Sequence, residues 1–148
     1  MSAKLTYPVL YVEDDDNDRL LLEMACSTAG VPFSLQVARD GVEAIAYLNG
    51  DGDYADRGRY PFPLLVLLDL KLPRKSGFEV LEWVRDQSEL KDIPIVVLSS
   101  SNRETDLKQA FERGAIYYFV KPVSLPRLVE MVKEIQLKWL AREVKQQQ

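Results

Sequence analysis

Histidine is absent from this sequence, and cysteine occurs only once. Without histidine the chain cannot contain a Ser-His-Asp or Cys-His nucleophile arrangement, a common zinc site or a phosphohistidine. The lone cysteine, Cys26, cannot form an internal disulfide, which favours a cytoplasmic location. Any chemistry must therefore come from carboxylates, lysine, hydroxyl groups and metals that bind oxygen.

A long apolar segment and an excess of basic residues are also missing. The apolar runs, such as residues 64–68, are too short to cross a bilayer, and no signal-peptide core follows Met1. The net charge of −4 argues against general nucleic-acid binding, which needs a basic surface. We therefore expect neither a membrane nor a nucleic acid as a partner.

Short apolar runs alternate with helical patterns along the chain. The runs are typical of strands covered on both faces and lie at residues 9–12, 33–37, 64–68, 95–98 and 117–120. A helical pattern follows each run, at residues 20–29, 42–48, 77–87, 103–113 and 124 to about 144. Asp16 and Ser101 are the expected N-caps of the first and fourth helices. This (βα)5 alternation predicts a doubly wound α/β domain with a five-stranded parallel sheet.

Residues 49–63 form the one irregular stretch between these elements. Three glycines and two prolines lie there among charged and aromatic residues. We expect a loop insertion between the second helix and the third strand, solvated on the surface, with a partner-docking loop as the alternative. The 148 residues otherwise fit a single domain, with a core from about 7 to 140.

Three carboxylates come directly after predicted strands. Glu13 and Asp14 follow the first strand, and Asp69 follows the third. Ligands of such folds bind at the carboxyl ends of the strands, so the three are expected to meet there. Carboxylates that lie so close together repel one another unless a cation is present, and Mg²⁺ suits an all-oxygen site. For the run from Glu13 to Asp16 taken alone, an acidic cap at a helix N-terminus is a better interpretation than metal binding.

A lysine and a serine end two further strands. The ammonium of Lys121 could pair with Asp69 or with a phosphoryl oxygen, and the Ser99 hydroxyl could donate to the same group. Taken alone, each is as well explained as an exposed strand end or a turn residue. Taken together, four of the five predicted strands end in groups that suit one Mg²⁺–phosphoryl site.

The motifs around these residues resemble those of two-component response-regulator receivers, the CheY-like family. Four motifs carry the resemblance: Val12-Glu13-Asp14-Asp15, Leu68-Asp69-Leu70-Lys71-Leu72-Pro73 with Ser76-Gly77, Leu98-Ser99-Ser100, and Tyr118-Phe119-Val120-Lys121-Pro122. They occur in the family's order and near its spacing. The resemblance implies a flavodoxin-like sheet with strand order 2-1-3-4-5.

The resemblance also implies an acceptor and a metal site. Asp69 matches the phosphoacceptor, which takes a phosphoryl group from a histidine kinase and becomes an acyl phosphate. Glu13 and Asp14 match the acidic pair that binds Mg²⁺ together with Asp69. The backbone carbonyl of Lys71 matches a further metal ligand.

The remaining matches concern the response to phosphorylation. Ser99 matches the switch hydroxyl, and Lys121 matches the lysine that contacts the phosphoryl group. Tyr118 matches the switch aromatic, whose ring turns inward on activation. The Lys121–Pro122 bond matches the family's cis peptide, so Pro122 is expected to be a cis-proline.

These matches imply a stand-alone response regulator that signals through protein contacts and is not an enzyme. Phosphorylation is expected to change the face formed by the fourth helix, the fifth strand and the fifth helix. The same face is a candidate homodimer interface, because four apolar residues of the last helix lie off its inner stripe: Met131, Leu137, Leu140 and Val144. The insertion and the long last helix resemble regulators paired with bacterial phytochromes.

Three other functions fit parts of the pattern. A HAD-like aspartyl-phosphate phosphatase would favour a second aspartate two positions after its nucleophile, where this chain has Lys71. A receiver-like interaction module that is never phosphorylated would not need the full set of site residues. A flavodoxin-like electron carrier would need a Gly/Ser/Thr-rich loop after the first strand, which is absent.

Overall fold

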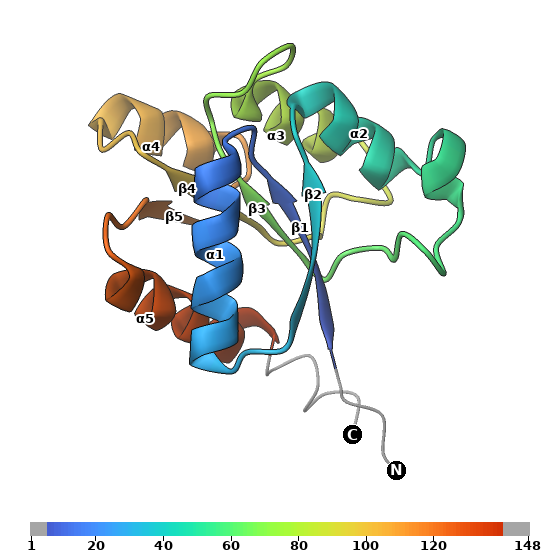
Figure 1. Cartoon of the computed structure of the whole chain (residues 1–148). Helices are drawn as coiled ribbons and strands as arrows, with labels where there is room; N and C mark the ends of the chain where they lie inside the picture. Colours follow the sequence, from blue (N-terminus) through green and yellow to red (C-terminus); the bar gives the residue numbers. More distant parts are fainter. Residues whose placement is uncertain (1–5, 141–148) are drawn as a thin grey trace.

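The computed structural model describes residues 6–140, which form one parallel sheet between two layers of helices (Figure 1). The sheet has five strands: β1 (Tyr7–Val12), β2 (Phe33–Ala38), β3 (Leu65–Leu68), β4 (Ile95–Ser99) and β5 (Tyr117–Val120). All neighbouring strands pair in parallel, in the order β2-β1-β3-β4-β5. The predicted doubly wound architecture and its strand order are confirmed.

Five α-helices connect or follow the strands: α1 (Asp16–Ala29), α2 (Gly41–Asn49), α3 (Gly77–Arg85), α4 (Glu104–Glu112) and α5 (Leu125–Ile135). A 3-10 turn, η1 (Gly52–Ala55), follows α2, and a π-helical turn, η2 (Gln136–Leu140), continues α5. The end of the predicted last helix lies outside the described residues. Among the helices that the structure describes, none combines the length and apolar character needed to cross a membrane.

Two predicted helix starts were wrong in detail. The N-cap of α1 is Asp15, whose Oδ1 accepts a hydrogen bond from the Asp18 amide at 3.0 Å. Several consecutive aspartates can each cap a helix, so composition alone does not select one. The residue before α4 is Arg103, which makes no capping bond with its side chain. Ser101 instead accepts from the Arg103 amide at 3.2 Å.

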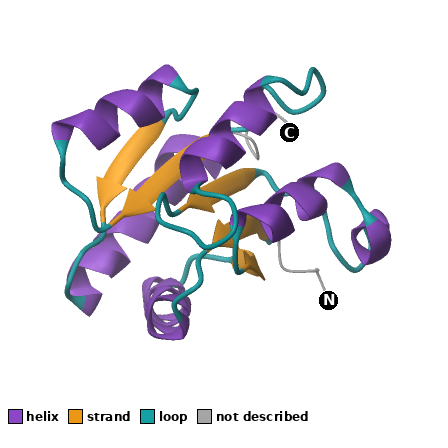
Figure 2. Cartoon of the chain, turned by 90° about the horizontal axis from the view of Figure 1, so that it is seen from above, coloured by secondary structure: helices purple, strands orange, loops and turns teal. Residues whose placement is uncertain are grey.

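The sheet buries both of its faces, because successive strand residues point to opposite sides. Leu10 and Val12 belong to the core cluster that contains residues of α2, α3 and α4. Val9 and Tyr11 belong to the cluster on the other face, with residues of α1 and α5. Figure 2 shows helices on either side of the strands. This two-sided burial explains why the strands are almost continuously apolar.

The insertion at residues 49–63 lies on the surface with most of its residues exposed, and its tyrosines pack against α2. The ring of Tyr54 lies 4.9 Å from that of Tyr47 on α2 and 5.0 Å from that of Tyr60. The Tyr47 hydroxyl donates to the Pro61 carbonyl at 2.8 Å. Arg57 stacks on the Tyr47 ring and donates to the last turn of α2. Packing of these aromatic rings holds the exposed loop against α2.

Two of the four apolar residues that were predicted to lie off the inner stripe of the last helix are buried. Met131 and Leu140 are buried in the core between α1, α5 and the sheet, whereas Leu137 is exposed. Val144 lies outside the described residues. Trp139 packs edge-on or tilted against Phe119 and Tyr117, with ring centroids 6.5 and 5.5 Å away. Two of the three described residues therefore belong to a wide core face of this helix.

Strand register determines which residues lie together at the edge of the sheet formed by the carboxyl ends of the strands. Val12 at the end of β1 is level with Leu68 at the end of β3, and Leu68 is level with Val97 in β4. Ser99 at the end of β4 is level with Val120 at the end of β5. The residues that directly follow β1, β3 and β5 are therefore brought to the same edge of the sheet.

Candidate metal and phosphoryl site

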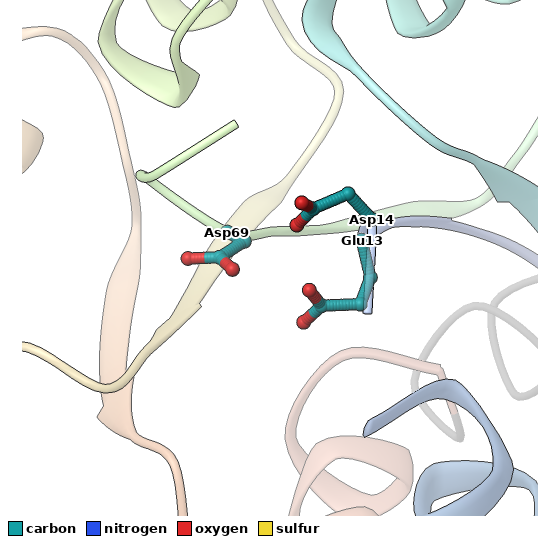
Figure 3. A group of neighbouring side chains, drawn as sticks. All are labelled: Glu13, Asp14 and Asp69. Carbon is teal, nitrogen blue, oxygen red and sulfur yellow. The ribbon is translucent and has the colours of Figure 1, made fainter. Parts of the chain in front are cut away.

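Three carboxylates meet at this edge. Glu13 and Asp14 follow β1, Asp69 follows β3, and one oxygen from each lies within 4.8 Å of the others (Figure 3). Glu13 and Asp69 are only 2% and 6% exposed, whereas Asp14 is open to solvent. An all-carboxylate donor set with one open side fits Mg²⁺, which takes oxygen ligands and keeps several waters. The predicted grouping of these three residues is confirmed.

Lys121 occupies the centre of the charge arrangement. Its ammonium donates to Glu13 Oε1, to Asp18 Oδ2 at 2.8 Å and to Asp69 Oδ2 at 3.2 Å. An ammonium has three N–H donors, so each of them has a carboxylate partner. The predicted pairing of Lys121 with Asp69 is confirmed.

Asp18 was not among the predicted site residues. It lies in the first turn of α1 and reaches the cluster because α1 starts directly beside the carboxyl end of β1. A further acidic residue after Asp16 was the available signal in the sequence. That signal is weak, because acidic residues are favoured in the first turn of any helix.

Burial and neighbouring charges shift the pKa values of Glu13 and Lys121 in opposite directions. Burial raises the pKa of Glu13, the hydrogen bond from Lys121 lowers it, and the charge of Asp69 raises it again. Burial by itself lowers the pKa of Lys121, but the carboxylates of Asp18, Glu13 and Asp69 outweigh it and raise that pKa above its usual value. Lys121 is therefore a permanent cation near neutral pH.

Tyr11 supports Glu13 from the core side. Its hydroxyl donates to Glu13 Oε1 at 3.3 Å. Burial, together with the charges of Glu13 and Asp18, raises the pKa of Tyr11 far above its usual value, so this hydroxyl remains a donor. Tyr11 thus fixes one oxygen of a carboxylate that is predicted to bind the metal.

The other predicted residues lie around β4 and β5. Ser99 is fully buried at the end of β4, and its Oγ accepts from the Ser101 amide at 3.3 Å. Tyr118 is buried in the core, and its hydroxyl donates to the Ser101 carbonyl at 2.8 Å. Its ring therefore points inward, and the bond ties β5 to the loop after β4. The switch roles of both residues stay predictions.

The loop after β3 keeps Lys71 beside the acceptor. The Lys71 amide donates to Asp69 Oδ1 at 3.3 Å, and the Gly77 amide donates to the Leu70 carbonyl at 2.9 Å. The loop is thus folded back onto the start of α3. The assignment of the Lys71 carbonyl to the metal stays a prediction.

The predicted cis-proline was wrong. In the part of the chain that the structure describes every peptide bond is trans, including the bond between Lys121 and Pro122. The two isomers of an X–Pro bond differ by only about 0.5–1 kcal/mol, so a Lys-Pro pair in the sequence does not decide between them.

Comparison with known proteins identifies the class to which this site belongs. The family model of the response regulator receiver domain matches residues 9–133, and the chain belongs to that family. The sequence is 38% identical to "Response regulator Rcp1" from Synechocystis sp. over 132 residues, covering 89% of this chain and 88% of that protein.

Solved structures agree. The fold is similar to the phosphorylated cyanobacterial phytochrome response regulator RcpA, with a TM-score of 0.83, 38% identity, and coverage of 93% of this chain and 96% of that one. It is also similar to the Mn²⁺-bound form of response regulator Rcp1, with a TM-score of 0.78, 37% identity, and coverage of 90% and 94%. The chain is thus a response regulator with a signalling role, and the phosphatase alternative is not favoured.

Proposed function

We propose that Asp69 accepts a phosphoryl group from a histidine kinase while Glu13, Asp14, Asp69 and the Lys71 carbonyl hold Mg²⁺. One observation carries the proposal: the carboxylates of Glu13, Asp14 and Asp69 meet within 4.8 Å, next to the Lys121 ammonium. The metal would neutralise charge on the transferred group. No turnover of small phosphoesters is expected, because Lys71 replaces the general-acid aspartate of a phosphatase.

The chain's own residues have separate roles in this reaction. A carboxylate oxygen of Asp69 attacks the phosphorus, the bond to the kinase histidine breaks, and the electron pair stays on the imidazole nitrogen. Lys121 binds a phosphoryl oxygen by donating an N–H that now goes to Asp69. The Ser99 hydroxyl donates to another oxygen, and Tyr118 follows the resulting movement of the loop after β4. Positioning and charge neutralisation supply the catalysis.

Acetyl phosphate can replace the kinase in a direct test. The protein is incubated with acetyl phosphate and Mg²⁺, and intact mass is compared for wild type, Asp69→Asn and Asp51→Asn. Asp51 is an exposed aspartate of the insertion and controls for general loss of one carboxylate. We expect wild type and Asp51→Asn to gain one phosphoryl group and Asp69→Asn to gain none. Removal of Mg²⁺ with EDTA should abolish the gain. Labelling of Asp69→Asn, or none of wild type, would refute the assignment.

We propose a bacterial phytochrome as the kinase partner and the cytoplasm as the location. The first rests on similarity to Rcp1 and to the phytochrome response regulator RcpA. The second rests on the single free thiol, Cys26, which fits a reducing compartment. Phosphotransfer from a phytochrome kinase should exceed transfer from an unrelated histidine kinase in a short time course. Equal transfer from both would count against the phytochrome partner.

We propose that the α4–β5–α5 face carries the output and a homodimer contact. Apolar side chains are exposed along it: Phe111, Ile116, Val120 and Val123. A groove of about 610 Å³ between β5 and α5 adjoins Lys121 and links this face to the site. Light scattering with and without acetyl phosphate tests the dimer, using Phe111→Glu and, as control, Phe62→Glu in the insertion. A monomer in both states would eliminate the dimer.

A further inference from the structure

Lys121 has one carboxylate partner that does not belong to the metal group. Asp18 Oδ2 accepts from the Lys121 ammonium at 2.8 Å, across 103 residues of sequence, while Glu13, Asp14 and Asp69 form the group that could hold a cation. The Lys121 side chain is 16% exposed and that of Asp18 is 37% exposed. The pair therefore lies at the rim of the site, between the start of α1 and the end of β5.

The three partners of Lys121 differ in what happens to them during the proposed reaction. Oxygens of Glu13 and Asp69 would hold the metal ion, and an oxygen of Asp69 would bond to the phosphoryl group. Neither oxygen of Asp18 is needed by the metal or by the phosphoryl group at any stage. Lysine has a flexible four-carbon stem with much rotamer freedom, so an ammonium without a fixed partner would spend less time at the position of the phosphoryl oxygens.

We propose that Asp18 is a positioning residue for phosphorylation of Asp69. It holds the Lys121 ammonium beside the acceptor while the other two partners of that ammonium become engaged. The proposal rests on the proposed function and assigns a role in it to a residue of α1.

The carboxylate of Asp18 lies in the first turn of α1, where any acidic residue is favoured, but it does not cap the helix. The Asp15 side chain caps the helix by accepting from the backbone amide of Asp18, so the Asp18 carboxylate is available to Lys121. Within the described residues, the neighbouring Arg19 pairs with Asp16 and Glu23 and not with Asp18. A carboxylate here also adds negative charge near the path of an anionic phosphodonor. Its effect through Lys121 must therefore be separated from its effect as a charge.

Asp16 supplies the matched control. It lies in the same turn of α1 and carries the same charge, but pairs with Arg19 and Arg39 on the surface. The rate of phosphorylation of Asp69 by saturating acetyl phosphate and Mg²⁺ is measured for wild type, Asp18→Asn and Asp16→Asn. We expect Asp18→Asn to be roughly fivefold slower, the size of a partly exposed ion pair, and Asp16→Asn to stay within about twofold of wild type. Asp18→Glu should recover part of the loss.

Two further readouts separate positioning from a structural effect. The Mg²⁺ affinity of Asp18→Asn should stay within about twofold of wild type, because Asp18 is outside the metal group. On a Lys121→Ala background, Asp18→Asn should cause no additional slowing, since it acts through that lysine. Thermal unfolding checks both variants, and Asp18→Ser repeats the comparison if Asp18→Asn fails to fold.

The outcomes distinguish this inference from the proposed function. If wild type is labelled at Asp69 and Asp18→Asn is no slower than Asp16→Asn, the positioning role is overturned and the phosphoacceptor stands. Full slowing by Asp18→Asn in the absence of Lys121 would overturn it as well. If wild type is not labelled at all, the proposed function itself fails.

Discussion

A Cβ atom added to Gly77 would lie 2.3 Å from the backbone carbonyl oxygen of Asp69 and 2.7 Å from the Cα of Leu70. Real side chains do not approach backbone atoms so closely, so the start of α3 can lie against the backbone of Asp69 only with glycine at position 77. The close approach, and not an unusual φ, sets the requirement. The first residue of α3 thereby helps to define where the acceptor carboxylate lies.

Replacing this glycine should move the acceptor. We expect Gly77→Ala to lower the free energy of unfolding by about 1–3 kcal/mol, as overpacking does, and to weaken Mg²⁺ binding. Urea unfolding and calorimetric titration with Mg²⁺ measure the two effects. Gly58→Ala is the control, because its nearest neighbour is the movable carboxylate of Asp56 at 3.3 Å. It should change stability by no more than about 0.5 kcal/mol. Equal behaviour of the two variants would contradict the steric argument.

A second prediction concerns Arg74, whose φ of 65° puts a non-glycine residue in the left-handed region. Its Nε and Nη2 bind Asp40 Oδ2 at 2.9 and 2.7 Å, while Asp40 Oδ1 caps α2 by accepting from the Glu43 amide at 2.7 Å. The ion pair thus joins the loop after β3 to the start of α2. It supplies part of the energy that keeps Arg74 in a strained conformation.

Two substitutions separate strain from pairing. Arg74→Ala loses the ion pair and keeps the strain, whereas Arg74→Gly loses the ion pair and relieves the strain. We expect Arg74→Gly to be the more stable of the two by about 0.5–1 kcal/mol, with both below wild type, in urea unfolding. Asp40→Ala should cost about 1–2 kcal/mol because it removes a cap as well as the pair. If Arg74→Ala matched Arg74→Gly, the left-handed backbone would carry no strain.

The charged site residues that the sequence identified all follow a strand. Glu13, Asp14, Asp69 and Lys121 could be placed because parallel strands end at a common edge, and apolar runs mark where the strands end. Asp18 could not be placed, since its role depends on how far the Lys121 side chain reaches across the edge. The isomer of the bond before Pro122 depends on an energy difference too small for the local sequence to decide.

The same limit applies outside the site. The packing of residues 49–63 depends on tyrosines from two segments that meet only after folding. The left-handed backbone at Arg74 depends on a partner 34 residues earlier in the chain. Periodic patterns report which face a residue occupies, but not which distant side chain it will contact.

The single thiol gives a third prediction. Cys26 is buried on α1, and burial, with a smaller contribution from the charge of Glu23, raises its pKa to about 12. The thiolate is the reactive form, so alkylation by iodoacetamide at about pH 8 should be more than about tenfold slower in the native protein than in urea. Fast native alkylation would show that the thiol is accessible.

The raised pKa of Cys26 also makes the stability of the protein depend on pH. Above the pKa of the unfolded thiol the unfolded chain loses this proton while the native protein keeps it, so the unfolded state binds fewer protons. Stability from this group is therefore fully present below about pH 8.5, the usual thiol pKa, and declines as pH rises toward 12. Urea unfolding of wild type and Cys26→Ala at several alkaline pH values isolates the contribution. The difference between them should shrink as pH rises.

A last prediction concerns the bond between Tyr118 and the loop after β4. The hydroxyl of Tyr118 donates to the Ser101 carbonyl at 2.8 Å, and both residues are buried. Tyr118→Phe removes the donor and leaves a buried acceptor without it, so the free energy of unfolding should fall by about 1 kcal/mol. Tyr60→Phe, in the insertion, is the control: in the described part of the chain its hydroxyl makes no comparable buried bond, and its loss should change stability by less than about 0.5 kcal/mol.

Because the bond links β5 to the residues after Ser99, the Tyr118 variant should also alter the change in the α4–β5–α5 face on phosphorylation. Amide hydrogen exchange with and without acetyl phosphate measures this change. An exchange pattern identical to wild type in both states would mean that this bond plays no part in the switch.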